Sequence, residues 1–92
     1  MTDGLNEAVA AVRGEVNRAS IRFGEFNSTH EALGVLIEEV RELEDAIRSN
    51  DVGAVAKESM QVSAVAMRLY SICRRAVDGD AADFSARSGG SR

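Results

Sequence analysis

The chain has 92 residues and one cysteine, Cys73, so it forms one domain with a modest core, no intrachain disulfide and no Cys/His zinc site. Its 11 basic and 15 acidic residues give a net charge of -4, which argues against binding of polymeric nucleic acid through a basic surface. No apolar run approaches the roughly 20 residues of a membrane span and no signal peptide is evident, so we expect a cytoplasmic protein that does not act at a membrane.

Packed helices suit this composition, because apolar residues make up 45% of the chain while aromatic residues make up 4% and proline is absent. An amphipathic helix is predicted over about residues 4–23, where apolar side chains recur at alternating steps of four and three. Its apolar stripe consists of Leu5, Val9, Val12, Val16, Ala19 and Phe23. The following residues 24–27 have the composition of a loop.

A capping box marks the start of a second helix, predicted over about residues 29–48. The Ser28 hydroxyl is expected to accept from the amide of Glu31, and the Glu31 carboxylate to accept from the amide of Ser28. The predicted core stripe consists of Leu33, Leu36, Ile37, Val40, Leu43 and Ile47.

A third helix is predicted over about residues 52–77, after a turn in which Asp51 is the expected cap. It is apolar on most sides, so three helices alone would leave apolar surface uncovered. We therefore expect an all-α helical bundle completed by homo-oligomerisation, as a tetramer with a dimer as the minimum unit. The domain is predicted to cover residues 1–77, followed by a flexible tail, 78–92, that is rich in Gly, Ser, Ala and Asp.

Carboxylates crowd one turn of the second helix. Glu39 lies on the immediate edge of the core stripe, with Glu42 and Glu38 following around the helix. Such a cluster is by itself more often a solvated acidic face than a binding site.

Glu58 is more unusual, because it projects from the same face of the third helix as several apolar side chains, with Gln61 one turn further on. A buried carboxylate needs a partner. Two interpretations remain open: ligation of a divalent cation, which prefers grouped oxygen ligands, or a buried ion pair with Lys57 or Arg68.

The stretches EEVRE (38–42) and ESMQ (58–61) resemble the EExxE and ExxD motifs of the all-alpha NTP pyrophosphohydrolases, which include MazG, dimeric dUTPases and HisE. The wider stretches FGEFNSTHEALGVLIEEVRELEDAI and KESMQVSAVAMRL look like the short MazG-like proteins common in bacteriophages, so the resemblance covers about residues 22–70. It implies an enzyme that converts a (deoxy)nucleoside triphosphate to the monophosphate and pyrophosphate, for example dGTP in a phage nucleotide pool. The implied cofactor is Mg²⁺, for which Mn²⁺ can substitute, and a phage-encoded enzyme would act in the host cytoplasm.

The resemblance also implies roles for individual residues. Glu39, Glu42 and Glu58 would be the principal magnesium ligands. Glu38 and Glu39 would be the catalytic residues, with Glu38 binding a further ion or acting as the base toward the attacking water. Gln61 would complete the metal shell, although it stands where the family usually has an aspartate and brings no charge.

Candidates for substrate binding lie near the two acidic motifs. They are Lys57, Arg22, Arg68, Phe26, Asn27 and His30. Lys57 is the first choice for the triphosphate, with a surface charge or an ion pair as the alternative for each cation. Phe26 could stack on a base and Asn27 could read its edge, whereas His30 is more often a capping or packing residue.

A different class of function remains as an alternative. The chain could be a non-catalytic helical interaction module whose acidic face is solvated and whose apolar faces bind a partner. Glu58 discriminates between the two, because an interaction module has no use for a carboxylate on its most apolar face.

Overall fold

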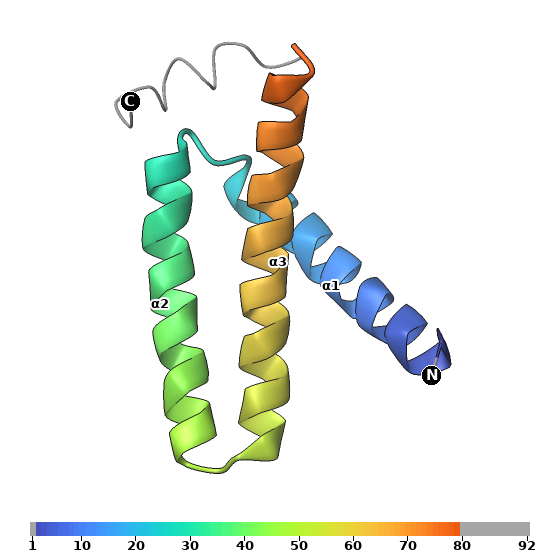
Figure 1. Ribbon diagram of the computed structural model, residues 1–92, viewed down its shortest axis with the longest axis vertical. Helices are drawn as coiled ribbons and strands as arrows, with labels where there is room; N and C mark the ends of the chain where they lie inside the picture. Colours follow the sequence, from blue (N-terminus) through green and yellow to red (C-terminus); the bar gives the residue numbers. More distant parts are fainter. Residues whose placement is uncertain (1, 80–92) are drawn as a thin grey trace.

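The computed structural model describes residues 2–79, which form three helices and no strand (Figure 1). Helix α1 spans Thr2–Phe23, α2 spans Thr29–Arg48 and α3 spans Val52–Val77. The predicted all-α class and the three helices are confirmed, with α1 beginning two residues before the predicted start at residue 4. Most of the predicted tail, residues 80–92, lies outside the described residues.

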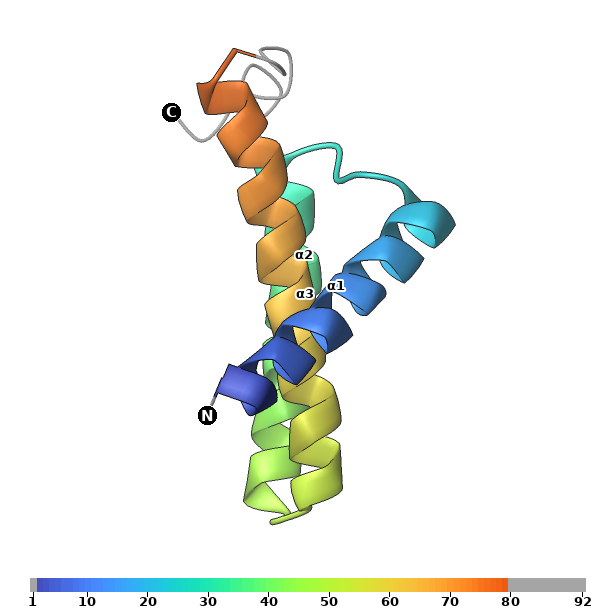
Figure 2. The same ribbon diagram turned by 90° about the vertical axis from the view of Figure 1, so that its right-hand side faces the viewer.

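Helices α2 and α3 form an antiparallel hairpin, and α1 crosses it at an angle (Figures 1 and 2). Helix α3 packs against both neighbours, whereas α1 and α2 scarcely contact each other. The central helix of the domain is therefore α3, and α1 is held to the hairpin mainly through it.

The helix ends follow the predicted capping residues. The Ser28 hydroxyl accepts a hydrogen bond from the Glu31 amide at 3.1 Å, and the Asp51 carboxylate accepts one from the Ala54 amide at 3.0 Å. The Glu31 carboxylate accepts from the amide of Asn27 at 2.6 Å, whereas the capping box predicted the amide of Ser28 as its donor. The Glu31 carboxylate thus binds the residue before Ser28, and this hydrogen bond fixes the end of the loop that joins α1 to α2.

The buried core is small and lies between the hairpin and the α1–α2 loop. It consists of Phe26, Ala32, Val65 and Ile72, with Val35, Leu36, Leu69, Cys73 and Ala76 packed partly buried against it. Cys73, which is followed in sequence by Arg74 and Arg75, is half-buried and packs against this core as a small apolar side chain.

The predicted core stripe of α2 is only partly correct. Leu36 and Leu43 are half-buried, but four other members of the stripe are 40–54% exposed: Leu33, Ile37, Val40 and Ile47. The buried positions of α2 are Ala32 and Ala46. Only α3 packs closely on α2, and the apolar stripe of α2 is wider than one neighbouring helix can bury. Helix α3 therefore covers one flank of the stripe and leaves the other flank exposed. We call the four exposed residues the α2 outer stripe.

Helices α1 and α3 also expose apolar side chains. In α1, Leu5 is 61% exposed and Phe23 is 69% exposed, although both belong to the predicted stripe of that helix. In α3, Val52 and Tyr70 are exposed as well, in line with the expectation that three helices alone leave apolar surface uncovered. None of the three helices in residues 2–79 combines the length and apolarity that a membrane crossing requires.

Candidate functional site

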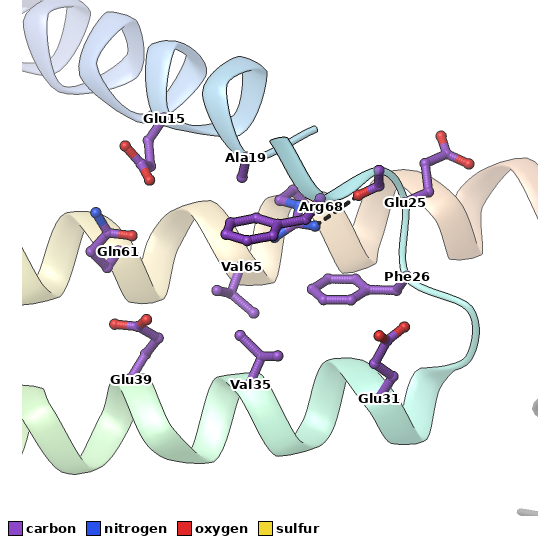
Figure 3. Close-up of a pocket in the computed structure, with 12 residues that line it drawn as sticks. Glu15, Ala19, Glu25, Phe26, Glu31, Val35, Glu39, Gln61, Val65 and Arg68 are labelled. Carbon is purple, nitrogen blue, oxygen red and sulfur yellow. Dashed lines mark hydrogen bonds between the residues drawn. The ribbon is translucent and has the colours of Figure 1, made fainter. Parts of the chain in front are cut away.

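Three predicted metal ligands converge at the middle of the hairpin. Glu39 and Glu42 come from α2 and Glu58 comes from α3, and one carboxylate oxygen from each lies within 4.8 Å of the other two. The antiparallel pairing explains the convergence: Glu39 lies opposite Gln61 (Figure 3), and one helical turn further along both helices position 42 meets position 58. We call Glu39, Glu42 and Glu58 the carboxylate cluster.

Within the carboxylate cluster, Glu39 is the residue whose pKa is shifted and whose side chain has a buried oxygen. Its Oε1 atom is buried and has no hydrogen-bond partner among residues 2–79. Burial raises the pKa of Glu39 above its ordinary value, and the charges of Glu42 and Glu58 raise it further. A bound proton or a bound cation would relieve this arrangement.

The donor set fits a hard divalent cation. Three carboxylates supply oxygen ligands, and the buried Glu39 Oε1 atom is an acceptor without a donor. The alternative ion pair of Glu58 is not formed, because no salt bridge within residues 2–79 involves Glu58. The predicted ligand Glu38 does not join the carboxylate cluster; it is exposed on α2 and contributes only a smaller charge effect on the pKa of Glu39.

Through Glu39, the carboxylate cluster adjoins a pocket of about 300 Å³, which we call the central pocket. It lies between the C-terminal half of α1, the α1–α2 loop and one side of the hairpin (Figure 3). Its lining residues are Glu15, Ala19, Phe23, Gly24, Glu25, Phe26, Glu31, Val35, Glu39, Gln61, Val65 and Arg68. Glu39 and Gln61 lie toward one end, and Phe26 and Glu31 lie toward the other (Figure 3). A ligand filling this pocket would therefore meet the Glu39 carboxylate and the Gln61 amide at one end, and the Phe26 ring beside the Glu31 carboxylate at the other.

Arg68 is the one basic residue of the described chain that lines the central pocket. It donates a hydrogen bond to the Gly24 carbonyl at 3.1 Å, and its guanidinium carbon lies 4.2 Å from the centre of the Phe26 ring. The same pocket is lined by four carboxylates: Glu15, Glu25, Glu31 and Glu39. Glu15 and Glu25 are ion-paired with Arg18 and Arg75, whereas Glu31 and Glu39 have no salt bridge within residues 2–79. An anionic ligand would therefore be repelled by these two carboxylates unless cations entered with it.

The other predicted substrate residues are only partly brought together. Phe26 lines the pocket but is 6% exposed, so its ring belongs mainly to the core. Lys57, Asn27 and His30 are exposed and do not line the pocket. Lys57 is one residue from Glu58, and one residue turns a helix by about 100°, which points the two side chains in different directions.

Arg22 lies outside the central pocket, beside it. Its guanidinium carbon is 5.1 Å from the centre of the Phe23 ring, and both residues line an adjacent hollow together with Glu15. Arg22 is therefore close to the mouth of the central pocket but does not point into the carboxylate cluster.

One pocket residue, Glu15 of α1, was not predicted from the sequence. Its side chain is 19% exposed, and it faces Gln61 across the pocket (Figure 3). A signal was present, because Glu15 follows Val12 by three residues and precedes Ala19 by four, which places it on the edge of the α1 stripe. This is the same pattern that singled out Glu39.

Comparisons of the chain with protein-family models, with curated proteins and with solved structures found no match.

The raised pKa of Glu39 predicts an unusual pH dependence of stability without metal. Since the folded protein binds a proton at Glu39 more tightly than the unfolded chain does, the contribution of Glu39 to stability falls as pH rises from the ordinary glutamate pKa through the raised one. In EDTA we expect the melting temperature to decrease across this window, and Glu39→Gln to flatten the decrease.

Millimolar Mg²⁺ or Mn²⁺ at neutral pH should raise the melting temperature by roughly 4–8 °C, as about 1 kcal/mol of binding would in a domain of this size. A melting temperature that is independent of pH and metal would contradict a cation site.

Proposed function

We propose that this chain is a magnesium-dependent nucleoside triphosphate pyrophosphohydrolase of the MazG-like kind, which releases a (deoxy)nucleoside monophosphate and pyrophosphate. The proposal rests chiefly on the carboxylate cluster, which meets from two helices at one end of a pocket large enough for part of a nucleotide. The sequence motifs that suggested this family contain all three members of the cluster.

Glu39 and Glu42 of α2 and Glu58 of α3 would hold Mg²⁺. The side-chain carbonyl of Gln61, also on α3, would complete the ligand set. When bound, the metal would offset the charge of the triphosphate and activate a water molecule for attack. Glu38 is exposed on α2 outside the carboxylate cluster, and it enters this proposal through the resemblance, as the residue that accepts the proton of the attacking water. The carboxylates themselves do not attack phosphorus.

The charge of the central pocket supports a substrate that arrives with metal. Glu31 and Glu39 would repel a free triphosphate, whereas a magnesium complex carries much less negative charge. Arg68 takes the role that the sequence assigned first to Lys57, because its guanidinium lines the pocket and has further N–H groups beyond the one bonded to Gly24. The apolar wall with Phe23 would receive the base or sugar.

A product assay tests this function most directly. The protein is incubated with each of the eight common ribo- and deoxynucleoside triphosphates, with Mg²⁺, with Mn²⁺ or with EDTA, and the phosphate products are separated. Monophosphate and pyrophosphate should form in the two metal arms and be absent with EDTA. Release of orthophosphate and a diphosphate would contradict the proposed bond cleavage, and no turnover of any nucleotide would contradict an enzyme of this class.

We further propose that the active form is a homo-oligomer, a tetramer with a dimer as its minimum unit. The α2 outer stripe and the exposed Leu5 and Phe23 of α1 are apolar surface that a second copy could cover. Sedimentation should therefore give a mass of two or four chains, and Val40→Arg in the stripe should reduce it. A stable monomer at micromolar concentration would overturn this assembly.

We propose that the pyrophosphohydrolase acts in the cytoplasm, or in the cytoplasm of the host if the chain is phage-encoded.

The α2 outer stripe also supports a second function class, a non-catalytic interaction module that binds a different protein through apolar helix faces. An interaction module would show neither turnover nor a metal-dependent melting temperature.

A further inference from the structure

We propose that Glu15 is a fourth carboxylate of the cation site, contributed by α1, and that it acts through water molecules bound to the cation on the side where Gln61 leaves a charge missing. This inference rests on the proposed metal-dependent function and extends it to α1, a helix in which neither sequence motif lies.

The geometry of Glu15 sets it apart from an ordinary surface glutamate. Its side chain is 19% exposed, whereas that of its ion-pair partner Arg18 is 66% exposed, so the carboxylate lies inward and the guanidinium outward. Both hydrogen bonds from Arg18 end on Oε1, at 3.1 Å from Nε and 2.8 Å from the terminal nitrogen. No hydrogen bond within residues 2–79 uses Oε2. Arg18 thus fixes the carboxylate and leaves one oxygen available toward the pocket.

The surroundings of Glu15 indicate what that oxygen would do. The Gln61 amide lies between the carboxylates of Glu15 and Glu39, one on each side (Figure 3). Gln61 is neutral, so a cation between the helices has negative charge from Glu39, Glu42 and Glu58 but none from position 61. Glu15 is the carboxylate that α1 adds to the lining of this pocket, on the wall opposite the hairpin.

Direct ligation is not what the arrangement supports. Glu15 does not belong to the carboxylate cluster, whose oxygens lie within 4.8 Å of one another. Magnesium usually keeps several of its waters, and acidic groups that bind those waters strengthen metal binding without touching the ion. Glu15 is therefore a positioning residue for the hydrated cation, and Glu39 is the direct ligand that lines the same pocket from the hairpin.

The test is a titration of the full chain with Mn²⁺, in which free Mn²⁺ is measured by its electron paramagnetic resonance signal without any nucleotide. Glu15→Gln should weaken binding about tenfold, in the range seen when an outer-shell partner of a metal site is removed. Glu7→Gln is the matched control, since Glu7 is an exposed glutamate of the same helix that does not line the pocket. It should change the affinity by less than about twofold.

A rescue separates a role toward the cation from a structural one. Gln61→Glu restores a negative charge at position 61, so the double variant of Glu15→Gln and Gln61→Glu should bind Mn²⁺ about as tightly as the parent. Melting in EDTA should be about the same for Glu15→Gln and the parent, because the Arg18 end of the ion pair is 66% exposed and such a solvated pair contributes little to stability. If Glu15→Gln melts early, Glu15→Asp, which keeps the charge but shortens its reach, should melt like the parent and still bind Mn²⁺ more weakly.

The outcomes separate this inference from the proposed function. A parent protein that binds no Mn²⁺ overturns the proposed function and the role of Glu15 with it. A parent that binds Mn²⁺ while Glu15→Gln binds it equally well overturns the role of Glu15 alone. Equal weakening by Glu7→Gln, or a double variant no tighter than Glu15→Gln, has the same consequence.

Discussion

Glu58→Gln is expected to lower pyrophosphate release by roughly a thousandfold or more, because it removes a charged ligand from a site whose fourth position, Gln61, is already neutral. Glu58 is the one carboxylate of the cluster that α3 provides, so its loss leaves only the neutral Gln61 as a ligand from that helix. The measurement is pyrophosphate release at saturating Mg²⁺ with the best substrate of the product assay.

The same variant should keep its fold. With no metal, replacing Glu58 removes a negative charge that repels Glu39 and Glu42, so the melting temperature in EDTA should equal or exceed that of the parent. Glu44→Gln is the matched control: Glu44 is an exposed glutamate of α2 that pairs with Arg48, and its loss should leave the activity unchanged. An active Glu58→Gln protein, or one that has lost several kcal/mol of stability in EDTA, would defeat the metal-site interpretation.

Phe26→Ala should produce the largest loss of stability of any substitution considered, about 3–5 kcal/mol. The Phe26 ring is 6% exposed, belongs to the buried core, and carries the guanidinium of Arg68 on its face at 4.2 Å. Truncation would leave a cavity and would free Arg68 from one of its two contacts. Such a loss is a large part of the stability of a small domain, which is typically about 5–15 kcal/mol.

Phe23→Ala is the natural control, because Phe23 is also a pocket phenylalanine but is 69% exposed. It should cost less than about 1 kcal/mol in urea unfolding, while weakening nucleotide binding if the apolar wall receives the base. Similar urea midpoints for the two variants would show that the core does not depend on Phe26.

The three helices could be predicted from the sequence because their signals are local. Caps at Ser28 and Asp51 and the periodic apolar positions define where each helix begins and which side is apolar. Which flank of an apolar side becomes buried is not a local property. It depends on the neighbour, and α3 covers Ala32 and Ala46 while leaving Ile37 and Val40 exposed.

In the candidate site, too, some positions follow from local sequence and others depend on how neighbouring elements pack. Glu39, Glu42 and Glu58 are grouped through the resemblance of their two motifs, and the antiparallel hairpin brings these three side chains together. Which of the predicted basic residues lines the pocket could not be predicted, since their positions depend on how the α1–α2 loop folds back. Arg68 enters the pocket through its hydrogen bond to Gly24, whereas Lys57, closer to the acidic motif in sequence, points elsewhere.

The weak contact between α1 and α2 has a consequence for the order in which the molecule forms. The α2–α3 hairpin is closed by a short turn, so its contacts are local and should form early, whereas docking of α1 requires the longer connection to fold back onto α3. The central pocket, which needs α1 as its wall, would then be the last part to assemble and the first to open by local unfolding. A ligand that bridges Glu15 and the hairpin would therefore slow amide hydrogen exchange throughout the C-terminal half of α1, well beyond the residues that it touches.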